Sequence, residues 1–292
     1  MYLFILNPTA GKGRSVNVFE QVKKVFDEKQ AEYRVWTTSY AGEATVLARK
    51  AAEEGFENVI SVGGDGTILE VATGLVGSGC TMGIIPAGTG NDFVRSLGMT
   101  VDAELAAKMI LEGNTKLIDI AKTEEDNYFI NVAGCGFDTE VLYCMDGFKK
   151  HFKGQMPYIL GLLKALFGYK CINAKIELDD QVIEQGIFIV AIANGKTYGG
   201  GMNVAPGAKV DDGMFDITIV DAVSKLTVLS ILPRFIKGKH NGVKQIRNYR
   251  SKKVRVTCEK EVPINMDGEI IGTMPMTFEV VPQALRMFVP KG

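Results

Sequence analysis

The sequence lacks several features that indicate common classes of protein. It has no apolar run of roughly 18 uncharged residues, the length of a membrane-spanning helix, because its best candidate, residues 156–163, ends at Lys164. Its two histidines and five cysteines, with no C-x-x-C pair, argue against a histidine-rich metal site, a zinc ribbon and a disulfide framework. The apolar N-terminal run is too short for a secretory signal. We therefore expect a soluble globular protein of the reducing cytoplasm.

The composition suits one large domain or two ordinary ones. The chain has 292 residues, of which 46% are hydrophobic, with 33 glycines and 9 prolines. A chain of this length and apolar content can bury substantial cores. The same balance excludes a disordered or collagen-like chain.

The net charge of −1 conceals an uneven distribution of charge. Residues 147–176 and 223–258 contain no acid but hold 16 of the 33 Lys and Arg, which leaves 17 basic against 34 acidic residues elsewhere. We call these two stretches the basic windows. The first window has six lysines, and five of them, Lys149, Lys150, Lys153, Lys164 and Lys170, accompany the apolar residues Phe148, Phe152, Tyr158, Leu162, Leu163, Leu166 and Phe167. His151 and His240 lie in the windows and are expected at the surface.

Lysines interleaved with aromatic and leucine side chains are typical of a helix at a membrane interface. Each basic residue near an anionic leaflet is worth on the order of 1 kcal/mol. Packing of the same apolar residues in a core is the alternative. No nucleic-acid-binding motif is present, so we expect an anionic membrane surface as partner and no nucleic acid.

The first 120 residues alternate strand and helix patterns. The expected strands are residues 2–6, 33–38, 58–62 and 82–86, and the expected helices are residues 15–30, 43–54, 68–75 and 102–112. Strands separated by helices pair in parallel and form a three-layer α/β domain.

The second half has strand patterns with few helices between them, apart from the basic windows. These strands are expected at residues 117–123, 128–133, 175–178, 187–193, 214–220, 253–257 and 277–281. Such a series favours an antiparallel β-sandwich. The predicted fold class is α/β + β, with a nucleotide-binding α/β domain over residues 1–122 followed by a β-sandwich domain over residues 123–277.

Three glycine-bearing loops follow strands of the predicted parallel sheet. They are Asn7-Pro8-Thr9-Ala10-Gly11, Gly63-Gly64-Asp65-Gly66-Thr67 and Gly88-Thr89-Gly90-Asn91-Asp92-Phe93. Ligands of such sheets bind at the carboxyl ends of the strands, and glycines let main-chain N–H groups approach a phosphate. None of the loops fits a P-loop or a dinucleotide-binding fingerprint, and Gly134-Cys135-Gly136 lacks the third glycine of the latter.

These loops, with motifs further along, resemble the diacylglycerol kinase catalytic-domain superfamily, in its bacterial soluble lipid-kinase branch. The later motifs are Gly199-Gly200-Gly201-Met202, Ala205-Pro206-x-Ala208-x-x-Asp211-Asp212-Gly213 and Asp267-Gly268-Glu269. They cover essentially the whole chain in the family's order. The central loop alone is shared with NAD kinases and phosphofructokinases, but the whole set is specific.

The resemblance implies a set of site residues. ATP would be bound by Asn7, Pro8, Thr9, Ala10, Gly11, Thr38, Gly63, Gly64, Asp65, Gly66, Thr67, Glu70, Thr89, Asn91 and Asp92. A water-linked catalytic Mg would lie among Asp65, Asp92 and Asp119, and a structural metal would bind Asp212 with the carbonyls of Lys209 and Met214. The general base would be Glu269, with Asp267 as its rival. The family's last strand returns to the first domain, which would place residues 278–292 there.

One residue departs from the family pattern. Leu69 stands where the family usually has Asn, two residues after Thr67, while Glu70 is retained. A leucine cannot hydrogen-bond, so the geometry of the loop or the affinity for nucleotide is expected to differ. No residue assigned to the chemistry is lost.

The predicted function is an ATP- and Mg-dependent lipid kinase at the inner face of the membrane, with diacylglycerol as the leading acceptor. Relatives that dimerise imply a homodimer as one assembly. The alternatives are a soluble-substrate kinase of the NAD-kinase type and a non-catalytic nucleotide- or lipid-binding regulator. The first gives no reason for the basic windows, and the second is motivated by Leu69.

Overall fold

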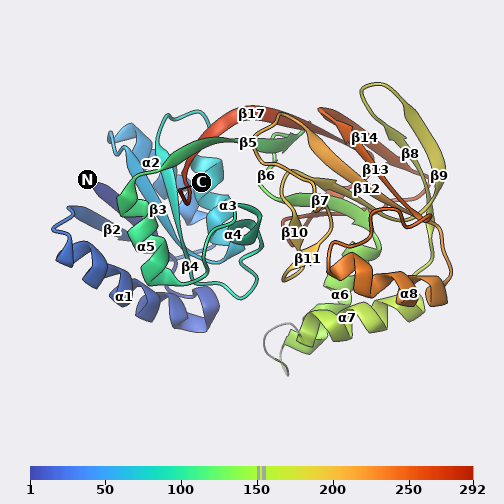
Figure 1. Cartoon of the computed structure of the whole chain (residues 1–292), viewed down its shortest axis with the longest axis horizontal. Coiled ribbons are helices and arrows are strands. Elements are labelled where there is room, and N and C mark those ends of the chain that lie inside the picture. Colours follow the sequence, from blue (N-terminus) through green and yellow to red (C-terminus); the bar gives the residue numbers. More distant parts are fainter. Residues whose placement is uncertain (150–151, 153–155, 292) are drawn as a thin grey trace. The chain divides into compact units, whose positions relative to one another are not determined.

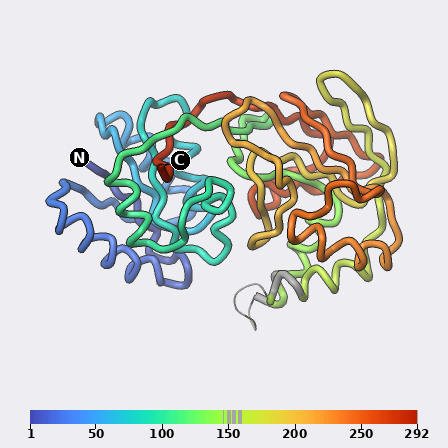
Figure 2. Tube along the Cα trace, in the orientation of Figure 1, coloured from blue at the N-terminus to red at the C-terminus, as the bar shows by residue number. Residues whose placement is uncertain are grey.

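The computed structural model describes residues 1–149, 152 and 156–291, and Figures 1 and 2 show how the chain runs through them. The chain divides into two compact units, one of Met1–Ile120 with Val281–Gly292 and one of Ala121–Val280. Within the described ranges, no helix is both long and apolar enough to cross a membrane.

The first unit is built on a parallel sheet. Strands β1 (Tyr2–Leu6), β2 (Tyr33–Thr37), β3 (Asn58–Gly63) and β4 (Thr81–Pro86) pair in the order β2-β1-β3-β4. The end of β17 (Met276–Phe288) extends the sheet, because Arg286 and Met287 pair in parallel with Thr81 and Met82. Strands β1, β3 and β4 are continuous apolar runs that are buried almost throughout, as in a parallel sheet covered on both faces.

Helices cover this sheet in two packed pairs. They are α1 (Arg14–Glu28), α2 (Glu43–Glu53), α3 (Asp65–Leu75), the short α4 (Asp92–Ser96) and α5 (Ala103–Glu112). Helix α1 packs against α5, and α2 packs against α3, which gives the predicted three-layer α/β arrangement (Figure 1). Where the sequence predicted a strand or helix in this unit, its bounds agree to within three residues.

The second unit is an antiparallel β-sandwich. Its strands pair in the order β16-β15-β7-β9-β8-β14-β17, and β9 also pairs with β12, which pairs with β13. The strands are β5 (Thr115–Thr123), β6 (Tyr128–Phe129), β7 (Val132–Gly136), β8 (Ile172–Glu177), β9 (Val182–Ala193), β10 (Thr197–Tyr198), β11 (Met202–Asn203), β12 (Phe215–Asp221), β13 (Ile246–Ser251), β14 (Lys253–Cys258), β15 (Pro263–Met266), β16 (Glu269–Thr273) and β17. One core between strands contains the ring stack of Phe129 on Phe215 and the edge contact of Phe129 with Phe278.

A second core lies between this β-structure and three helices, α6 (Phe137–Lys149), α7 (Met156–Gly168) and α8 (Lys225–Ile236). The first basic window therefore covers the end of α6 and all of α7, while Lys150, His151 and Lys153 lie outside the described residues. The second window is helical only in α8 and continues into β13 and β14. The prediction that His240 lies at the surface is wrong. The residue is fully buried, because the loop after α8 folds its ring onto Phe235.

Close packing of α2 on α3 depends on a glycine. A methyl group on Gly74 would lie 2.6 Å from the Ala48 Cβ and 2.6 Å from the Thr45 carbonyl oxygen. We expect Gly74→Ala to lower the free energy of unfolding by about 1–3 kcal/mol, because two helices must separate. Urea unfolding measures this change. The control is Gly168→Ala, where nothing lies within 4 Å and a helix gains up to about 1 kcal/mol; equal effects of the two changes would contradict the packing.

Candidate active site

The predicted loops of the first unit meet at the carboxyl edge of its parallel sheet. The main chain already joins them, because the Asn7 N–H donates to the Val62 carbonyl at 3.1 Å and the Ala87 N–H donates to the Gly63 carbonyl at 2.7 Å. Thr38 follows β2 at the same edge, and its N–H donates to the Leu6 carbonyl at 2.9 Å. This edge is where ligands of open parallel sheets bind.

Side chains connect the first loop to the other two. The Asn7 amide nitrogen donates to the Thr67 hydroxyl at 3.0 Å, while its oxygen accepts hydrogen bonds from Thr9. The Arg14 guanidinium donates to the carbonyls of Ala87, at 3.2 Å, and Gly88. The three loops that the sequence singled out therefore form one bonded assembly.

Glycines allow the second and third loops to touch through their main chains. A methyl group on Gly88 would lie 2.6 Å from the Gly64 Cα, and one on Gly64 would lie 3.2 Å from the Gly88 Cα. A side chain at Gly90 would lie 2.7 Å from Oδ2 of Asp65. The contacts at Gly88 and Gly90 are too short for any side chain unless a neighbour moves, and the contact at Gly64 is tight. Packing therefore favours glycine at all three positions.

The carboxylate of Asp65 holds the third loop. It accepts the N–H of Asn91 at 2.8 Å and of Asp92 at 2.9 Å. Burial raises the pKa of Asp65, and the hydrogen bonds from the main chain oppose that rise. Asp65 thus has a structural role at the start of α3, and the catalytic and metal-binding roles expected of it stay predictions.

Three acids were predicted to surround a catalytic Mg. Asp65 and Asp92 both face Gly90, since a methyl group there would be 2.7 Å and 3.5 Å from their nearest oxygens. Asp119 is buried in β5, and its Oδ1 accepts the N–H of Gln283 at 2.9 Å. Across the described ranges, no three His, Cys, Asp or Glu side chains are close enough to hold a metal ion directly. Carboxylates are ligands that suit Mg²⁺, which usually keeps several of its waters, and the metal among these three acids stays a prediction.

Glu70 contacts the start of α2. Its two carboxylate oxygens accept the N–H groups of Gly42 at 3.0 Å and Ala44 at 3.2 Å. A carboxylate satisfies the unpaired N–H groups of a helix N-terminus and interacts favourably with its dipole. Glu70 therefore fixes the turn that follows Thr38. Both residues are predicted to contact the nucleotide.

The two rivals for the general base lie in the second unit, in and beside the hairpin turn between β15 and β16. Asp267 and Gly268 have φ of 50° and 94°, and a two-residue hairpin turn of type I′ requires positive φ at both positions. The Asp267 carboxylate accepts the N–H groups of Ile130, Asn131 and Val132 at 2.8–3.1 Å. Glu269 is exposed, and no hydrogen bond or ion pair of its carboxylate occurs within the described part of the chain.

In the loop predicted to hold a structural metal, Asp212 forms an ion pair, and the described residues there include no group of three acids placed to bind a metal ion. Arg250 donates to the Asp212 carboxylate, and its Nε lies 3.8 Å from Oδ2 of Asp216. Burial raises the pKa of Asp216, Arg250 lowers it, and the charge of Asp212 raises it. Lys209 and Met214, whose carbonyls complete the predicted set, lie in the same segment. The metal at this loop stays a prediction.

A small apolar cavity of about 40 Å³ lies under α6, α7 and α8. Its walls are formed by Phe137, Asp138, Leu162, Phe188, Ile189, Tyr198, Met202, Val220, Val228, Ile231, Leu232 and Phe235. Asp138 is 4% exposed. Its Oδ2 accepts the Asn265 amide N–H at 3.0 Å, and its buried Oδ1 has no hydrogen-bond partner among the residues that the structure describes. Burial raises its pKa from 3.8 to about 6, although the Asn265 hydrogen bond lowers it.

Sequence reasoning did not single out Asp138. The acid directly follows Gly134-Cys135-Gly136-Phe137, a segment whose glycines do not complete a dinucleotide-binding fingerprint. The acid stands in the first turn of α6, where a negative charge favours a helix. Nothing local shows that this position is buried.

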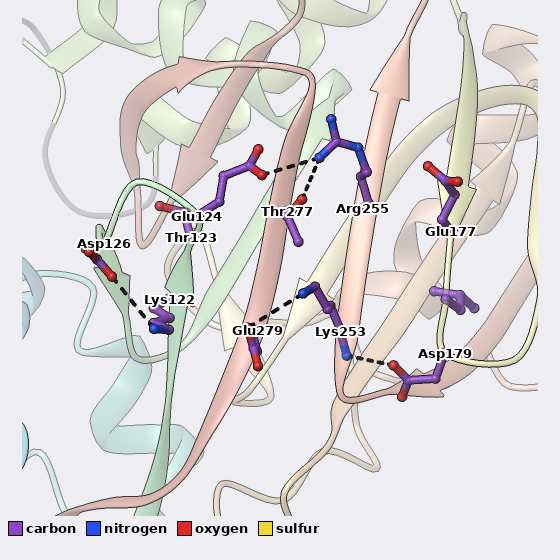
Figure 3. A pocket seen from close by; sticks show the side chains of 11 residues that line it. Lys122, Thr123, Glu124, Asp126, Glu177, Asp179, Lys253, Arg255, Thr277 and Glu279 are labelled. Carbon is purple, nitrogen blue, oxygen red and sulfur yellow. Dashed lines mark hydrogen bonds and ion pairs between the residues drawn. The ribbon is translucent and has the colours of Figure 1, made fainter.

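A larger cavity of about 510 Å³ lies on the second unit and is polar (Figure 3). Its charged side chains pair with one another: Lys122 with Asp126 at 3.7 Å, Lys253 with Glu279 at 3.9 Å, and Arg255 with Glu124 at 3.3 Å. None of the predicted site residues lines it. Its size alone therefore does not make it the reaction site.

The raised pKa of Asp138 has a consequence for stability. Between about pH 4 and 6 the folded chain binds a proton that the unfolded chain releases, so the stability is present in acid and is lost as the pH rises through about 6. We expect Asp138→Asn to unfold at higher urea than wild type at pH 7.5, by about 1–3 kcal/mol, with a smaller gain at pH 5. A variant less stable than wild type at pH 7.5 would contradict this.

Comparisons with known proteins agree with this geometry. Residues 1–123 match the diacylglycerol kinase catalytic domain family, and residues 131–289 match the YegS C-terminal NAD kinase beta sandwich-like domain family. The chain is 32% identical to the diacylglycerol kinase of Bacillus subtilis over 98% of this chain and 95% of that protein, and 29% identical to that of Mycobacterium tuberculosis over 98% and 94%.

Solved structures show the same fold. The crystal structure of a putative diacylglycerol kinase from Bacillus anthracis superposes with a TM-score of 0.84 at 29% identity, covering 99% of this chain and 94% of that one. The two family matches cover the glycine loops of the first unit and the β-sandwich of the second, and the relatives contain both parts in one chain. The chain is a kinase, and it belongs to the bacterial diacylglycerol kinase family.

Proposed function

We propose that the protein is a lipid kinase that transfers the γ-phosphate of ATP, with Mg, to the hydroxyl of diacylglycerol to give phosphatidic acid. The observation that carries this proposal is the bonded assembly of three glycine loops at one edge of a parallel sheet. Such an edge presents main-chain N–H groups and helix N-termini to phosphate oxygens. The match to the kinase family gives that edge its reaction class.

The nucleotide would be held by the first unit. Gly64 and Gly88 bring two main chains together, because neither residue carries a side chain that would hold them apart. Thr89 and Gly66 are exposed at the same edge, where a phosphate can reach their N–H groups. Catalysis of phosphoryl transfer depends chiefly on such alignment and on stabilising charge.

The divalent metal would be held by Asp65, Asp92 and Asp119. When bound, Mg²⁺ offsets the negative charge that develops on the phosphate oxygens. The hydrogen bonds from Asn91 and Asp92 orient the Asp65 carboxylate and oppose the rise in its pKa that burial causes. These residues therefore supply a fixed negative patch beside the phosphate-binding loops.

Glu269 is the better candidate for the general base. Its carboxylate is exposed and can accept a proton from the acceptor hydroxyl as the oxygen bonds to the γ-phosphorus and the bond to the β-phosphate oxygen breaks. Asp267 already accepts three main-chain N–H groups, so its lone pairs are occupied in holding the turn.

A lipid acceptor is supported by the apolar cavity in the second unit. Apart from Asp138 and Tyr198, its lining residues are apolar. Its volume of about 40 Å³ is close to that of one water molecule in the liquid, roughly 30 Å³, so only a short piece of chain would fit as it stands. A longer acyl chain requires α7 and α8 to move apart, which their exposed position on the sandwich allows (Figure 1).

The outer faces of the same helices support membrane association. Phe167 on α7 is 75% exposed and Leu226 on α8 is 79% exposed, and Lys225 donates to the Phe167 carbonyl, which joins the two helix ends. Lys164, Arg234 and Lys237 are exposed on these helices. Apolar and basic groups on one surface are complementary to an anionic leaflet. We propose peripheral association with the cytoplasmic face of the membrane.

The deciding experiment is transfer of labelled phosphate from Mg-ATP to a panel of lipids in mixed micelles, with NAD included. We expect label on diacylglycerol. Glu269→Gln should lower kcat by about 10²–10⁴-fold with unchanged unfolding, whereas Asp267→Asn should lower the unfolding temperature, because one of its oxygens no longer accepts N–H groups.

The panel also separates the alternatives. Label on NAD would favour a soluble-substrate kinase, a candidate kept because the second matched domain is described as NAD kinase-like. ATP binding without transfer to any acceptor would contradict a kinase. A Glu269→Gln variant with wild-type kcat would refute the assignment of the base.

Vesicle binding tests the membrane surface. We expect wild type to sediment with vesicles containing anionic phospholipid but far less with phosphatidylcholine alone, and to be released by salt. The double variant Phe167→Ser, Leu226→Ser should bind at least about tenfold more weakly, because it loses two apolar side chains that would enter the bilayer. Val182→Ser, which changes another exposed apolar residue of the same unit, is the control. Equal binding of all three proteins would refute the surface.

A further inference from the structure

The turn that carries Glu269 is held from two sides. On one side, the Asp267 carboxylate accepts three main-chain N–H groups. On the other, the Asn265 side-chain oxygen accepts the Gly268 N–H at 3.0 Å, and the Asn265 nitrogen donates to Asp138 at 3.0 Å. Asn265 and Asp138 are 2% and 4% exposed, so water does not compete for these bonds.

Asp138 determines which way the Asn265 amide faces. An ionised carboxylate can only accept hydrogen bonds, whereas an amide has one donating and one accepting end. Asp138 therefore requires the nitrogen of Asn265, and the oxygen is left for the N–H of Gly268. With an apolar residue in place of Asp138, only the Gly268 N–H selects the orientation of the amide, and the Asn265 nitrogen loses the acceptor that holds it from the other end.

We propose that Asp138 is a positioning residue for phosphoryl transfer: through the Asn265 amide it holds the Gly268 N–H and thereby sets the place of Glu269. The inference rests on the proposed function, because it concerns the base assigned there. The hydrogen-bonded series links α6, β15 and the turn before β16 across 127 residues of sequence.

The surroundings of Asp138 make its charge costly. Among the described residues its Oδ1 has no hydrogen-bond partner, and the cavity beside it is lined mostly by apolar side chains. The titratable groups that interact with it are Cys135 on β7 and Tyr169 after α7, and the buried Tyr169 hydroxyl has no partner within the same ranges. Neither group is a cation that would offset the carboxylate, although main-chain N–H groups at the start of α6 favour its charge. A leucine or asparagine would avoid this cost, so the position of the acid agrees with a functional role.

Protonation of Asp138 weakens the hydrogen bonds that connect it through Asn265 to Gly268. The neutral acid is a poorer acceptor, and its O–H can itself donate, so the orientation of Asn265 is no longer imposed. With a pKa of about 6, the carboxyl changes state within the working range of an enzyme. The place of Glu269 should then become less defined below about pH 6.

The test compares wild type with Asp138→Leu, Asp138→Asn and Tyr169→Phe in the lipid-transfer assay between pH 5 and 8. We expect Asp138→Leu to lower kcat at pH 7.5 by about 10–100-fold, with KM for the lipid within about twofold of wild type. Asp138→Asn keeps an accepting oxygen and should retain most of kcat, but it should lose the fall in kcat below pH 6. Tyr169→Phe removes a neighbouring unpaired hydroxyl and should behave as wild type.

Hydrogen exchange gives a readout that does not depend on activity. In Asp138→Leu, the amides of residues 266–269 should exchange at least about tenfold faster than in wild type, with no change in Tyr169→Phe. If wild type transfers phosphate to no lipid, the proposed function fails, and exchange still decides the hydrogen-bonded series. Unchanged exchange in Asp138→Leu would overturn the inference. A raised KM with unchanged kcat would also overturn it, because Asp138 would then serve the cavity and not the turn.

Discussion

The hydrogen bonds from the main-chain N–H groups of Asn91 and Asp92 to the carboxylate of Asp65 are the constraint on which the candidate site depends. They hold the third glycine loop against the second, at the distance that Gly64 and Gly88 permit. An acceptor with one fewer oxygen, or with a donor in its place, would leave a buried N–H unpaired, at a cost of about 1–3 kcal/mol. An acid that is predicted to bind a metal is often assumed to have no other task, but the Asp65 carboxylate also fixes the conformation of the third loop.

The second unit uses the same physical device. Asp267 accepts three successive N–H groups, much as Asp65 accepts two, and in each case a carboxylate fixes a segment that carries a proposed functional group. A carboxylate suits this task because it has several lone pairs and no donor. The Glu70 carboxylate likewise accepts two N–H groups at the N-terminus of α2 and fixes that segment. The kinase motifs thus contain acids that hold loops as well as acids available for chemistry, and the sequence alone does not separate them.

The sequence sufficed where the signal is local. Strand β1 matches the prediction at both ends because its apolar run stops at the turn of Asn7 and Pro8. The meeting of the three loops was also predictable, since parallel strands present their carboxyl ends at one edge. Asp138 was not, because its burial comes from α7, α8 and Asn265, all distant in sequence. His240 was misplaced for the same reason: its basic neighbours indicated the surface, while the fold places its ring on Phe235.

The buried acid also shows how stability and activity can oppose each other. A buried carboxylate in an apolar wall lowers the stability of the fold above about pH 6, although its place in the first turn of α6 offsets part of that cost. Functional sites are where such costs persist, because a fully relaxed core would not hold a reactive group in one place. If Asp138 sets the orientation of Asn265, the unfavourable charge and the ordered turn have a single cause, since an ionised carboxylate can only accept the hydrogen bond from the Asn265 nitrogen. The instability of the acid is then a direct consequence of what it does for Glu269.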